Sequence, residues 1–250
     1  MRKWIVISVT LFVTLPGWSQ LQKLCRYGVL PTDNITSLEV NPSLTAADDS
    51  GGVSTSQLLF KAYRVISSHW NWGVEVPLVR FESPDKSVNG LGDILVNVTW
   101  MKPESSNRVG YGAKMEFLTP TATDKHLGSG KLQASPSLFA VWTSGNGWYV
   151  AATYKHYVSV LGDHAREDIN YGRIRGNISY LSENKWWVQT NYYYYQNFRD
   201  SGKMEFVPEV ELGALVNEGA AFFINGSTHA AGNWKSKDWS MGVGFKVLYL

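Results

Sequence analysis

The chain has 250 residues, of which 44% are hydrophobic and 14% aromatic, and its 23 basic and 21 acidic residues leave a formal charge of only +2. A chain so close to neutral lacks the basic surface that binds nucleic acid, so no nucleic-acid partner is expected. The single cysteine cannot form an intrachain disulfide, which excludes a fold stapled by disulfides.

The N-terminus has the order of a secretory signal peptide. Arg2 and Lys3 form a basic region, residues 4–15 form an apolar one, and a small-residue cleavage site ends at Ser19. The apolar run is too short to span a bilayer as a helix. Residues 1–19 are therefore predicted to direct export, and their removal leaves 21 basic and 21 acidic residues.

Residues 20–54 are polar and irregular, and a first strand is expected there only around residues 35–40. Residues 55–250 instead consist of segments in which apolar and polar residues alternate, separated by turn sequences such as Asn89-Gly90. Alternate residues of a strand point to opposite faces, so each segment has one apolar and one polar face. The expected strands span residues 56–66, 72–81, 92–102, 109–119, 131–143, 147–159, 171–181, 185–197, 205–216, 219–226 and 238–250.

The number of segments favours a barrel with an even number of strands. Together with the segment near residues 35–40 they make twelve, and bacterial outer-membrane barrels have even strand numbers. Ten strands are the alternative, if residues 56–66 or 219–226 do not form a strand. The segment 56–66 is the least regular, because Lys61 and Arg64 fall on opposite faces.

The fold class predicted is all-β, an antiparallel transmembrane β-barrel with a polar lumen. No stretch after the leader reaches the roughly 20 apolar residues of a membrane helix. Strands that enter a membrane must close into a barrel, because an open sheet edge leaves backbone groups unpaired in lipid. The many aromatic residues suit the girdles at the two membrane interfaces. Residues 120–130 and 161–170 are predicted to be mobile loops at the outer rim.

The C-terminal end is a second indication of this fold. Residues 238–250 alternate up to the end of the sequence, which finishes Val247-Leu248-Tyr249-Leu250. Outer-membrane barrels end in an alternating strand with an aromatic residue at or near the terminus, which the barrel assembly machinery recognises. The sequence therefore predicts location in a Gram-negative outer membrane, with outer-membrane lipid and the assembly machinery as partners.

Assigning the apolar face of each strand to lipid leaves the polar face to line the lumen. We expect Lys114 and Glu116 to lie beside the strand of Asp93, and two arginines to reach two glutamates across a narrow lumen. Such charges either act on a passing solute or form an ion-pair network inside the barrel, because a buried charge needs a partner or water. The predicted lumen residues are Glu75, Asp93, Lys114, Glu116, Lys155, Arg173, Arg175, Glu209, Glu211 and Lys246.

Two pairs of residues were candidates for the catalytic site of a barrel enzyme: Ser67 with His69, and Ser227 with His229. Their order differs from the His-x-Ser order of barrel phospholipases and deacylases, and a histidine in a rim loop is the commoner explanation. Two further histidines, His126 and His164, each lie close to an aspartate in sequence but without the regular spacing of a metal site. The sequence therefore predicts no catalytic residue, metal or cofactor.

Two stretches of the sequence carry a resemblance to a known family. The first is Gly90-Leu91-Gly92-Asp93-Ile94, which leads into an alternating strand. The second runs from Phe117-Leu118-Thr119-Pro120-Thr121 through a polar loop to Leu127-Gly128-Ser129-Gly130-Lys131 and Ser135-Pro136-Ser137. Together they resemble the outer-membrane β-barrel family labelled transporter, or "MetA-pathway of phenol degradation", with the identifiable motifs in residues 90–136.

The resemblance implies an outer-membrane barrel that passes or binds small, often hydrophobic or aromatic compounds, and it supplies no catalytic residues. Gly92 and Asp93 are expected to serve structure, since glycine permits a turn and an aspartate accepts hydrogen bonds from turn amides. The predicted function is a passive channel or binding protein for a small solute of unknown identity. The alternatives are a barrel enzyme acting on lipid and a soluble, secreted lipocalin-like binding barrel, whose apolar faces would point inward.

Overall fold

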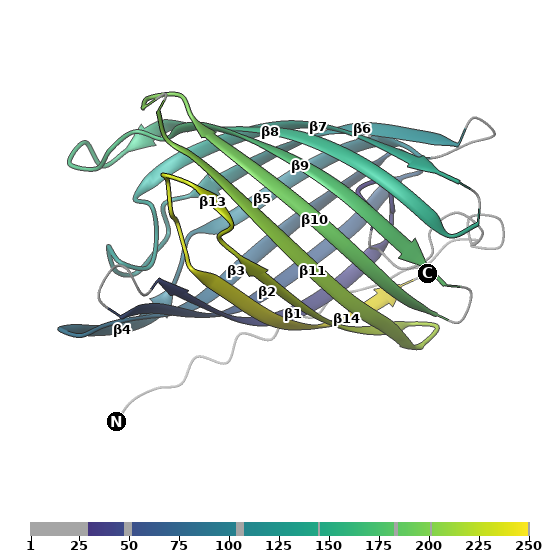
Figure 1. The fold of residues 1–250 in the computed structure, drawn as a ribbon, viewed down its shortest axis with the longest axis horizontal. Helices are drawn as coiled ribbons and strands as arrows, with labels where there is room; N and C mark the ends of the chain where they lie inside the picture. The colour runs from purple at the N-terminus through teal and green to yellow at the C-terminus, as the bar shows by residue number, and fades with distance from the viewer. Residues whose placement is uncertain are drawn as a thin grey trace.

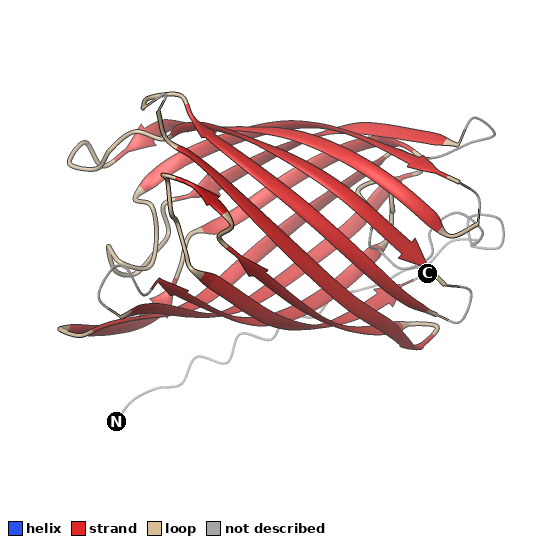
Figure 2. Ribbon diagram, viewed as in Figure 1, coloured by secondary structure: helices blue, strands red, loops and turns tan. Residues whose placement is uncertain are grey.

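The structure is a computed structural model that describes residues 30–47, 52–103, 108–144, 146–182, 185–200 and 202–249. These residues form an all-β barrel whose strands are strongly tilted against its long axis (Figures 1 and 2). The predicted signal peptide lies outside the described residues. Among those residues, no helix is long and apolar enough to cross a membrane.

The described residues form fourteen strands, and each strand coincides with a segment whose sequence alternates or is bounded by turns. They are β1 (Thr36–Ala47), β2 (Val53–Ser67), β3 (Trp70–Ser83), β4 (Lys86–Leu91), β5 (Ile94–Lys102), β6 (Val109–Thr119), β7 (Lys131–Thr143), β8 (Trp148–Gly162), β9 (Asn170–Leu181), β10 (Trp186–Asn197), β11 (Met204–Asn217), β12 (Ala220–Thr228), β13 (Ala231–Gly232) and β14 (Trp239–Tyr249).

The strands occupy twelve positions around a closed barrel. Each strand pairs antiparallel with its neighbours, and β14 pairs with β1 to close the seam, with Thr36 opposite Tyr249. The short strand β4 extends the position of β5 along β3, and β13 extends the position of β12 along β11. The predicted twelve-stranded barrel is therefore confirmed, and both doubtful segments, 56–66 and 219–226, lie in strands. The first strand runs on to Ala47, well beyond the segment 35–40 in which a strand was expected.

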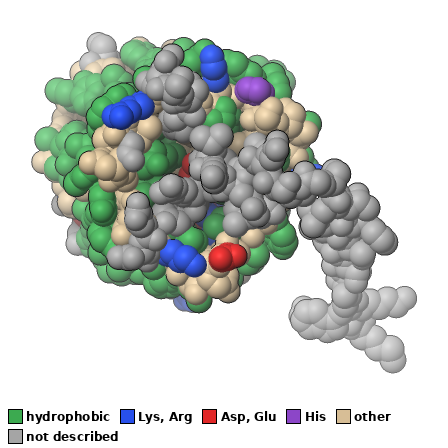
Figure 3. Space-filling model, turned by 90° about the vertical axis from the view of Figure 1, so that its right-hand side faces the viewer, with side chains coloured by type: hydrophobic (Ala, Val, Ile, Leu, Met, Phe, Trp, Pro, Cys, Tyr) green, Lys and Arg blue, Asp and Glu red, His purple; other side chains and the backbone are tan. Residues whose placement is uncertain are grey.

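Apolar side chains face outward and polar side chains face inward. In β14, Met241, Val243 and Phe245 are exposed on the outer surface, while the intervening Gly242 and Gly244 are buried inside. Seen from the end where the chain finishes, hydrophobic side chains surround much of the circumference (Figure 3). A soluble lipocalin-like barrel would have the opposite orientation, so the structure contradicts that alternative.

Aromatic side chains gather on the outer surface near both ends of the barrel. At the end that contains the C-terminus, Trp142, Trp148 and Trp186 are each more than 40% exposed. At the other end, Tyr194 and Trp239 also face outward. These two bands match the aromatic girdles with which membrane barrels meet the two interfaces of the bilayer.

The connections at the two ends differ in length. Two-residue turns at 68–69 and 218–219 lie at the C-terminal end of the barrel, which we call the turn end. The longer connections 120–130, 163–169 and 229–238 lie at the opposite end, which we call the loop end. Outer-membrane barrels have short turns on the periplasmic side and longer loops outside.

Four prolines inside strands mark interruptions of the hydrogen-bond ladder. Pro42, Pro77, Pro136 and Pro208 each pair with one neighbouring strand, but the ladder to the other neighbour is broken at their position. Proline has no N–H group and cannot donate to a ladder, so it is tolerated only where one side needs no donor. The barrel places these residues at such gaps.

The interior at the turn end contains an apolar cluster. Trp187 and Phe223 pack there with Leu181 and Ala221, all of them buried. A Cβ atom on Gly213 or Gly244 would come within 2.1 or 2.0 Å of the Trp187 or Phe223 ring. Glycine at these two inward positions therefore makes room for the large rings. The polar part of the lumen begins beyond this cluster.

The lumen as candidate functional site

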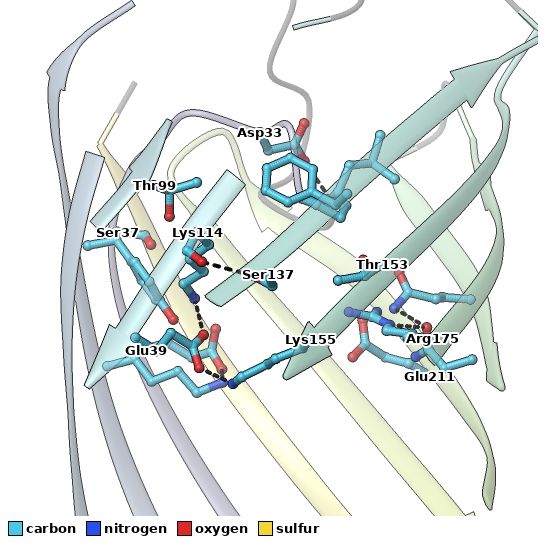
Figure 4. Close-up of a pocket in the computed structure, with 18 of the residues that line it drawn as sticks. Asp33, Ser37, Glu39, Thr99, Lys114, Ser137, Thr153, Lys155, Arg175 and Glu211 are labelled. Carbon is cyan, nitrogen blue, oxygen red and sulfur yellow. Dashed lines mark hydrogen bonds and ion pairs between the residues drawn. The ribbon is translucent and has the colours of Figure 1, made fainter. Parts of the chain in front are cut away.

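A cavity of about 440 Å³ lies inside the barrel (Figure 4). Its wall is made almost entirely by the inward positions of the strands, which is where the alternation places polar residues. Eight of the ten predicted lumen residues line it: Lys114, Glu116, Lys155, Arg173, Arg175, Glu209, Glu211 and Lys246.

The remaining two predicted residues do not line the cavity. Glu75 accepts a hydrogen bond from the Tyr63 hydroxyl at 2.5 Å. Asp93 lies at the loop end, where its carboxylate accepts hydrogen bonds from the backbone N–H groups of Ala122 (3.1 Å) and Ser129 (2.6 Å). Asp93 therefore holds the loop 120–130 against the barrel, because the turn amides satisfy its charge.

The structure also places lumen charges that the sequence pattern did not single out. Glu39, Lys61, Tyr63 and Tyr193 all line the cavity. Glu39 belongs to β1, most of which lies where the sequence is irregular, and Lys61 belongs to the least regular predicted strand. The sequence could have identified both residues, because the alternation within β1 and β2 places them on the inner face of the barrel.

One ion-pair cluster crosses the seam of the barrel. The Glu39 carboxylate lies 2.8 Å from Lys61 Nζ and 3.3 Å from Lys246 Nζ, and the three residues come from β1, β2 and β14. Glu39 is only 6% exposed. A buried carboxylate is tolerated when opposite charges lie this close, so the cluster neutralises itself within the wall.

A second ion-pair cluster is built by β6 and β8. The Glu116 carboxylate lies 2.8 Å from Lys114 Nζ and also forms an ion pair with Lys155 Nζ. Glu116 and Lys155 are both buried. As expected from the alternation, Lys114 and Glu116 lie beside β5, the strand that follows Asp93.

The two arginines do not meet the two glutamates as the sequence led us to expect. Among the described residues, neither Arg173 nor Arg175 has a carboxylate oxygen within 4.0 Å. Instead Arg175 Nε donates to Asn191 Oδ1 at 2.9 Å. The reason is that β10 lies between β9 and β11, and its polar side chains fill the space between the arginines and the glutamates.

The glutamates of β11 are satisfied by neutral donors. Glu209 accepts hydrogen bonds from Asn191 Nδ2 at 2.8 Å and from the Tyr193 hydroxyl at 3.1 Å. Glu211 accepts one from Trp187 Nε1 at 2.8 Å. These hydrogen-bond partners are neutral, and the cavity is lined by acidic and basic side chains together.

Inward aromatic rings continue the lumen wall toward the loop end. Tyr157 and Tyr171 are stacked with ring centroids 4.3 Å apart, and Trp234 meets Tyr171 edge-on at 5.2 Å. The guanidinium of Arg173 lies 5.6 Å from the centre of the Tyr157 ring and 5.3 Å from that of Tyr193. Cations are attracted to ring faces at these distances, so the tyrosines stabilise this arginine without neutralising it.

Residues 30–35 cross the lumen at the turn end. Leu30 packs against Val141 and Ala151 of β7 and β8, which lie opposite β1 in the barrel, and the chain then reaches β1 at Thr36. A hydrogen bond from Leu30 N to Asp33 Oδ2, at 2.9 Å, stabilises the turn within this segment (Figure 4). This crossing, which the sequence pattern did not reveal, narrows the lumen and supplies part of the cavity wall.

Neither serine–histidine pair has catalytic geometry. His229 Nδ1 lies 3.2 Å from Glu205 Oε1, whereas Ser227 Oγ contacts Ser240 Oγ and Lys237 Nζ, both at 2.7 Å. In the other pair, His69 Nδ1 contacts Ser68 Oγ at 2.8 Å. A serine nucleophile needs the histidine ring as its base within hydrogen-bond reach, and neither ring contacts its candidate serine.

Side chains that could bind a metal are not grouped in the described part of the chain. Within it, no three His, Cys, Asp or Glu side chains lie close enough together to hold a metal ion. His126 Nδ1 instead lies 2.7 Å from Asp124 Oδ1, in the loop 120–130. Hydrogen bonds to the N–H and ring of His126 lower the pKa of Asp124 to about 2.

Several solved structures to which this chain is similar are outer-membrane channels or porins. The COG4313 outer membrane channel from Pseudomonas putida F1 aligns with a TM-score of 0.71 and 10% identity, over 86% of this chain and 96% of that one. The KdgM porin aligns with a TM-score of 0.59 and 10% identity, over 86% of this chain and 99% of that one. The CymD monoaromatic hydrocarbon channel aligns with a TM-score of 0.50 and 9% identity, over 86% of this chain and 89% of that one.

The comparisons define the class of fold. No protein-family model matches the sequence, and no curated protein matches it. The chain therefore has the porin-like, twelve-stranded barrel fold of outer-membrane channels, and the solved neighbours named above are channels and porins rather than enzymes.

Proposed function

We propose that this protein is a passive channel for small solutes in the outer membrane. One observation carries the proposal: a closed barrel with an apolar, aromatic-banded outer surface encloses a cavity lined by charged side chains. Such a wall is stable in lipid because every strand is paired, and a polar interior admits water and polar groups. Its location, its export by the leader and recognition of β14 by the barrel assembly machinery form part of the same proposal.

We also propose that the chain is a member of the transporter or "MetA-pathway of phenol degradation" family. The two stretches that resemble this family meet in space, since Asp93 of the first accepts hydrogen bonds from Ser129 of the second. A Cβ atom on Gly128 would lie 2.4 Å from Asp93 Oδ1, so glycine is needed for this close approach. The motif residues therefore support one another as a single structural unit at the loop end.

The solutes proposed are small and include aromatic compounds. The inward tyrosines and Trp234 provide ring surfaces between the loop end and the charged cavity. A planar solute can stack on such surfaces while its polar groups meet the charged wall. The family resemblance implies the same class of compound.

Single-channel conductance in planar bilayers tests the proposal, with two variants of adjacent residues in β7. Ser137 lines the cavity, whereas Leu138 is 66% exposed on the outer surface. We expect the wild-type protein to conduct, Ser137→Trp to reduce the conductance by filling part of the cavity, and Leu138→Trp to leave it unchanged. Absence of conductance from folded protein, with unchanged solute uptake in a deletion strain, would contradict the channel function.

A further inference from the structure

The basic residues of the lumen fall into two groups with different partners. The lysines Lys61, Lys114, Lys155 and Lys246 form ion pairs with Glu39 or Glu116. Arg173 and Arg175, two residues apart on β9, both line the cavity without a carboxylate within 4.0 Å among the described residues. The lysines are thus paired with carboxylates inside the wall, whereas neither arginine is in direct contact with a carboxylate of the described residues.

Neutral surroundings hold the arginines in position and use only part of their donors. Arg175 spends one N–H group, at Nε, on the neutral Asn191. Arg173 lies against the Tyr157 and Tyr193 rings, and its buried Nε has no hydrogen-bond partner. Because both arginines line the cavity, their remaining N–H groups can donate to a ligand there.

The geometry of two neighbouring guanidinium groups suits a carboxylate. A guanidinium is planar and always charged, and it presents paired N–H groups that match the two oxygens of a carboxylate. Residues i and i+2 of a strand lie about 7 Å apart on the same face, so both arginines can contact one small anion. The aromatic side chains of Tyr157 and Tyr193 lie beside this point, with the guanidinium of Arg173 over both rings.

We propose that Arg173 and Arg175 form a binding site in the lumen for a small aromatic carboxylate, with the tyrosines beside them packing against its ring. The proposal deepens the proposed channel function, because it names the class of solute that the lumen selects. The two arginines bind the carboxylate oxygens, and the solute ring lies in the space between the charged cavity and the aromatic residues of the loop end. Lumen lysines take no part, since Glu39 and Glu116 already neutralise them.

Equilibrium binding of sodium benzoate to the folded, detergent-solubilised protein tests this site by isothermal titration calorimetry. We expect benzoate to bind, and the neutral analogue benzamide to bind at least about tenfold more weakly, because it cannot form charge-assisted hydrogen bonds. Arg173→Gln and Arg175→Gln should each weaken benzoate binding by about tenfold or more on the same grounds. Arg64→Gln is the matched control, since Arg64 is exposed on the outer surface, and it should leave binding unchanged.

Further arms separate a carboxylate site from general attraction of anions. Arg175→Lys keeps the charge but loses the planar pair of donors, so benzoate should still bind more weakly to it than to the wild type. This variant also keeps the test decisive if Arg173→Gln does not fold, which heat-modifiable gel mobility will show. The proposal would be overturned if the wild type bound no detectable benzoate, or if the Arg175 variants bound benzoate as tightly as the wild type. It would also be overturned if the wild type bound inorganic phosphate as tightly as benzoate.

The binding assay and the conductance assay fail independently. A protein that conducts but does not bind benzoate would remain a channel with no aromatic carboxylate site. A protein that binds benzoate but does not conduct would keep the site and lose the channel function.

Discussion

The two sides of the lumen contain the same kinds of charge but neutralise them in different ways. Figure 4 shows Glu39, Lys114 and Lys155 on one side of the cavity, and Arg175 with Glu211 on the other. On the first side every lysine touches a carboxylate, and the wall is an ion-pair network. On the second side neutral amides and aromatic rings separate acids from bases. The alternation of residues along a strand therefore predicts that a charged side chain points into the lumen. The group that this side chain contacts then decides whether it stabilises the barrel or is left to meet a solute.

The largest expected effect comes from removing the carboxylate shared by two lysines. Glu116→Gln leaves Lys114 and Lys155 without their counter-charge, and we expect it to lower the free energy of unfolding by about 3 kcal/mol, the lower end for a broken buried pair because the cavity admits water. Urea unfolding in phospholipid vesicles, followed by gel mobility, measures the loss. The double variant Glu116→Gln/Lys155→Met should recover part of it, and a single variant as stable as wild type would contradict the network.

A smaller loss is expected at the seam. Glu39→Gln removes the carboxylate from Lys61 and Lys246, whose side chains are 22% and 14% exposed. Because the contact of Glu39 with Lys246, at 3.3 Å, is longer than a good charge-assisted hydrogen bond, we expect the free energy of unfolding to fall by about 2 kcal/mol. The same urea titration checks this value, and a loss larger than that of Glu116→Gln would reverse the order.

On the arginine side, a change of charge should hardly alter stability. Arg175→Gln breaks no ion pair, and a glutamine amide can still donate to Asn191, so we expect the free energy of unfolding to change by less than about 1 kcal/mol. The measurement is again urea unfolding in vesicles. A loss as large as that of Glu39→Gln would mean that Arg175 belongs to the structural network after all.

The smallest effect is expected outside the lumen, in the loop 120–130. Asp124 has a pKa of about 2 in the folded protein, below its usual 3.8, because His126 donates hydrogen bonds to it. Its contribution is therefore present above about pH 4 and lost as the pH falls toward 2. Hydrogen exchange of residues 120–130 should speed up between pH 5 and pH 2.5, corrected for intrinsic rates, and Asp124→Asn should reduce that change, because the Asp93 carboxylate also holds the loop. Equal pH dependence in the variant would contradict this role.

Most of the fold could be predicted from the sequence, because a period of two is a local property of each strand. The first strand was underestimated because Pro42 interrupts its pattern, although the barrel accommodates that proline where the ladder to β14 is broken. The crossing of the lumen by residues 30–35 could not be predicted. Its place depends on β7 and β8, which are distant in the sequence.

The arginine partners could not be predicted either, because alternation gives the face of a residue but not its register. Arg175 lies opposite Tyr193, and Tyr193 lies opposite Val207. Glu209 lies opposite Asn191, in the next inward row. The register of β9 against β10 and that of β10 against β11 must therefore both be known to see that Arg175 and Glu209 are not direct neighbours.

The seam between β1 and β14 has a consequence for how the barrel forms. All other neighbouring positions are joined by a hairpin connection, so those pairings are local and can form as each hairpin folds. The seam joins the two ends of the barrel domain, with Thr36 opposite Tyr249, and long-range pairing of this kind is slower to form than a hairpin. The contact between Glu39 and Lys246 spans this seam, so it helps to hold together a pairing that no hairpin connection supports.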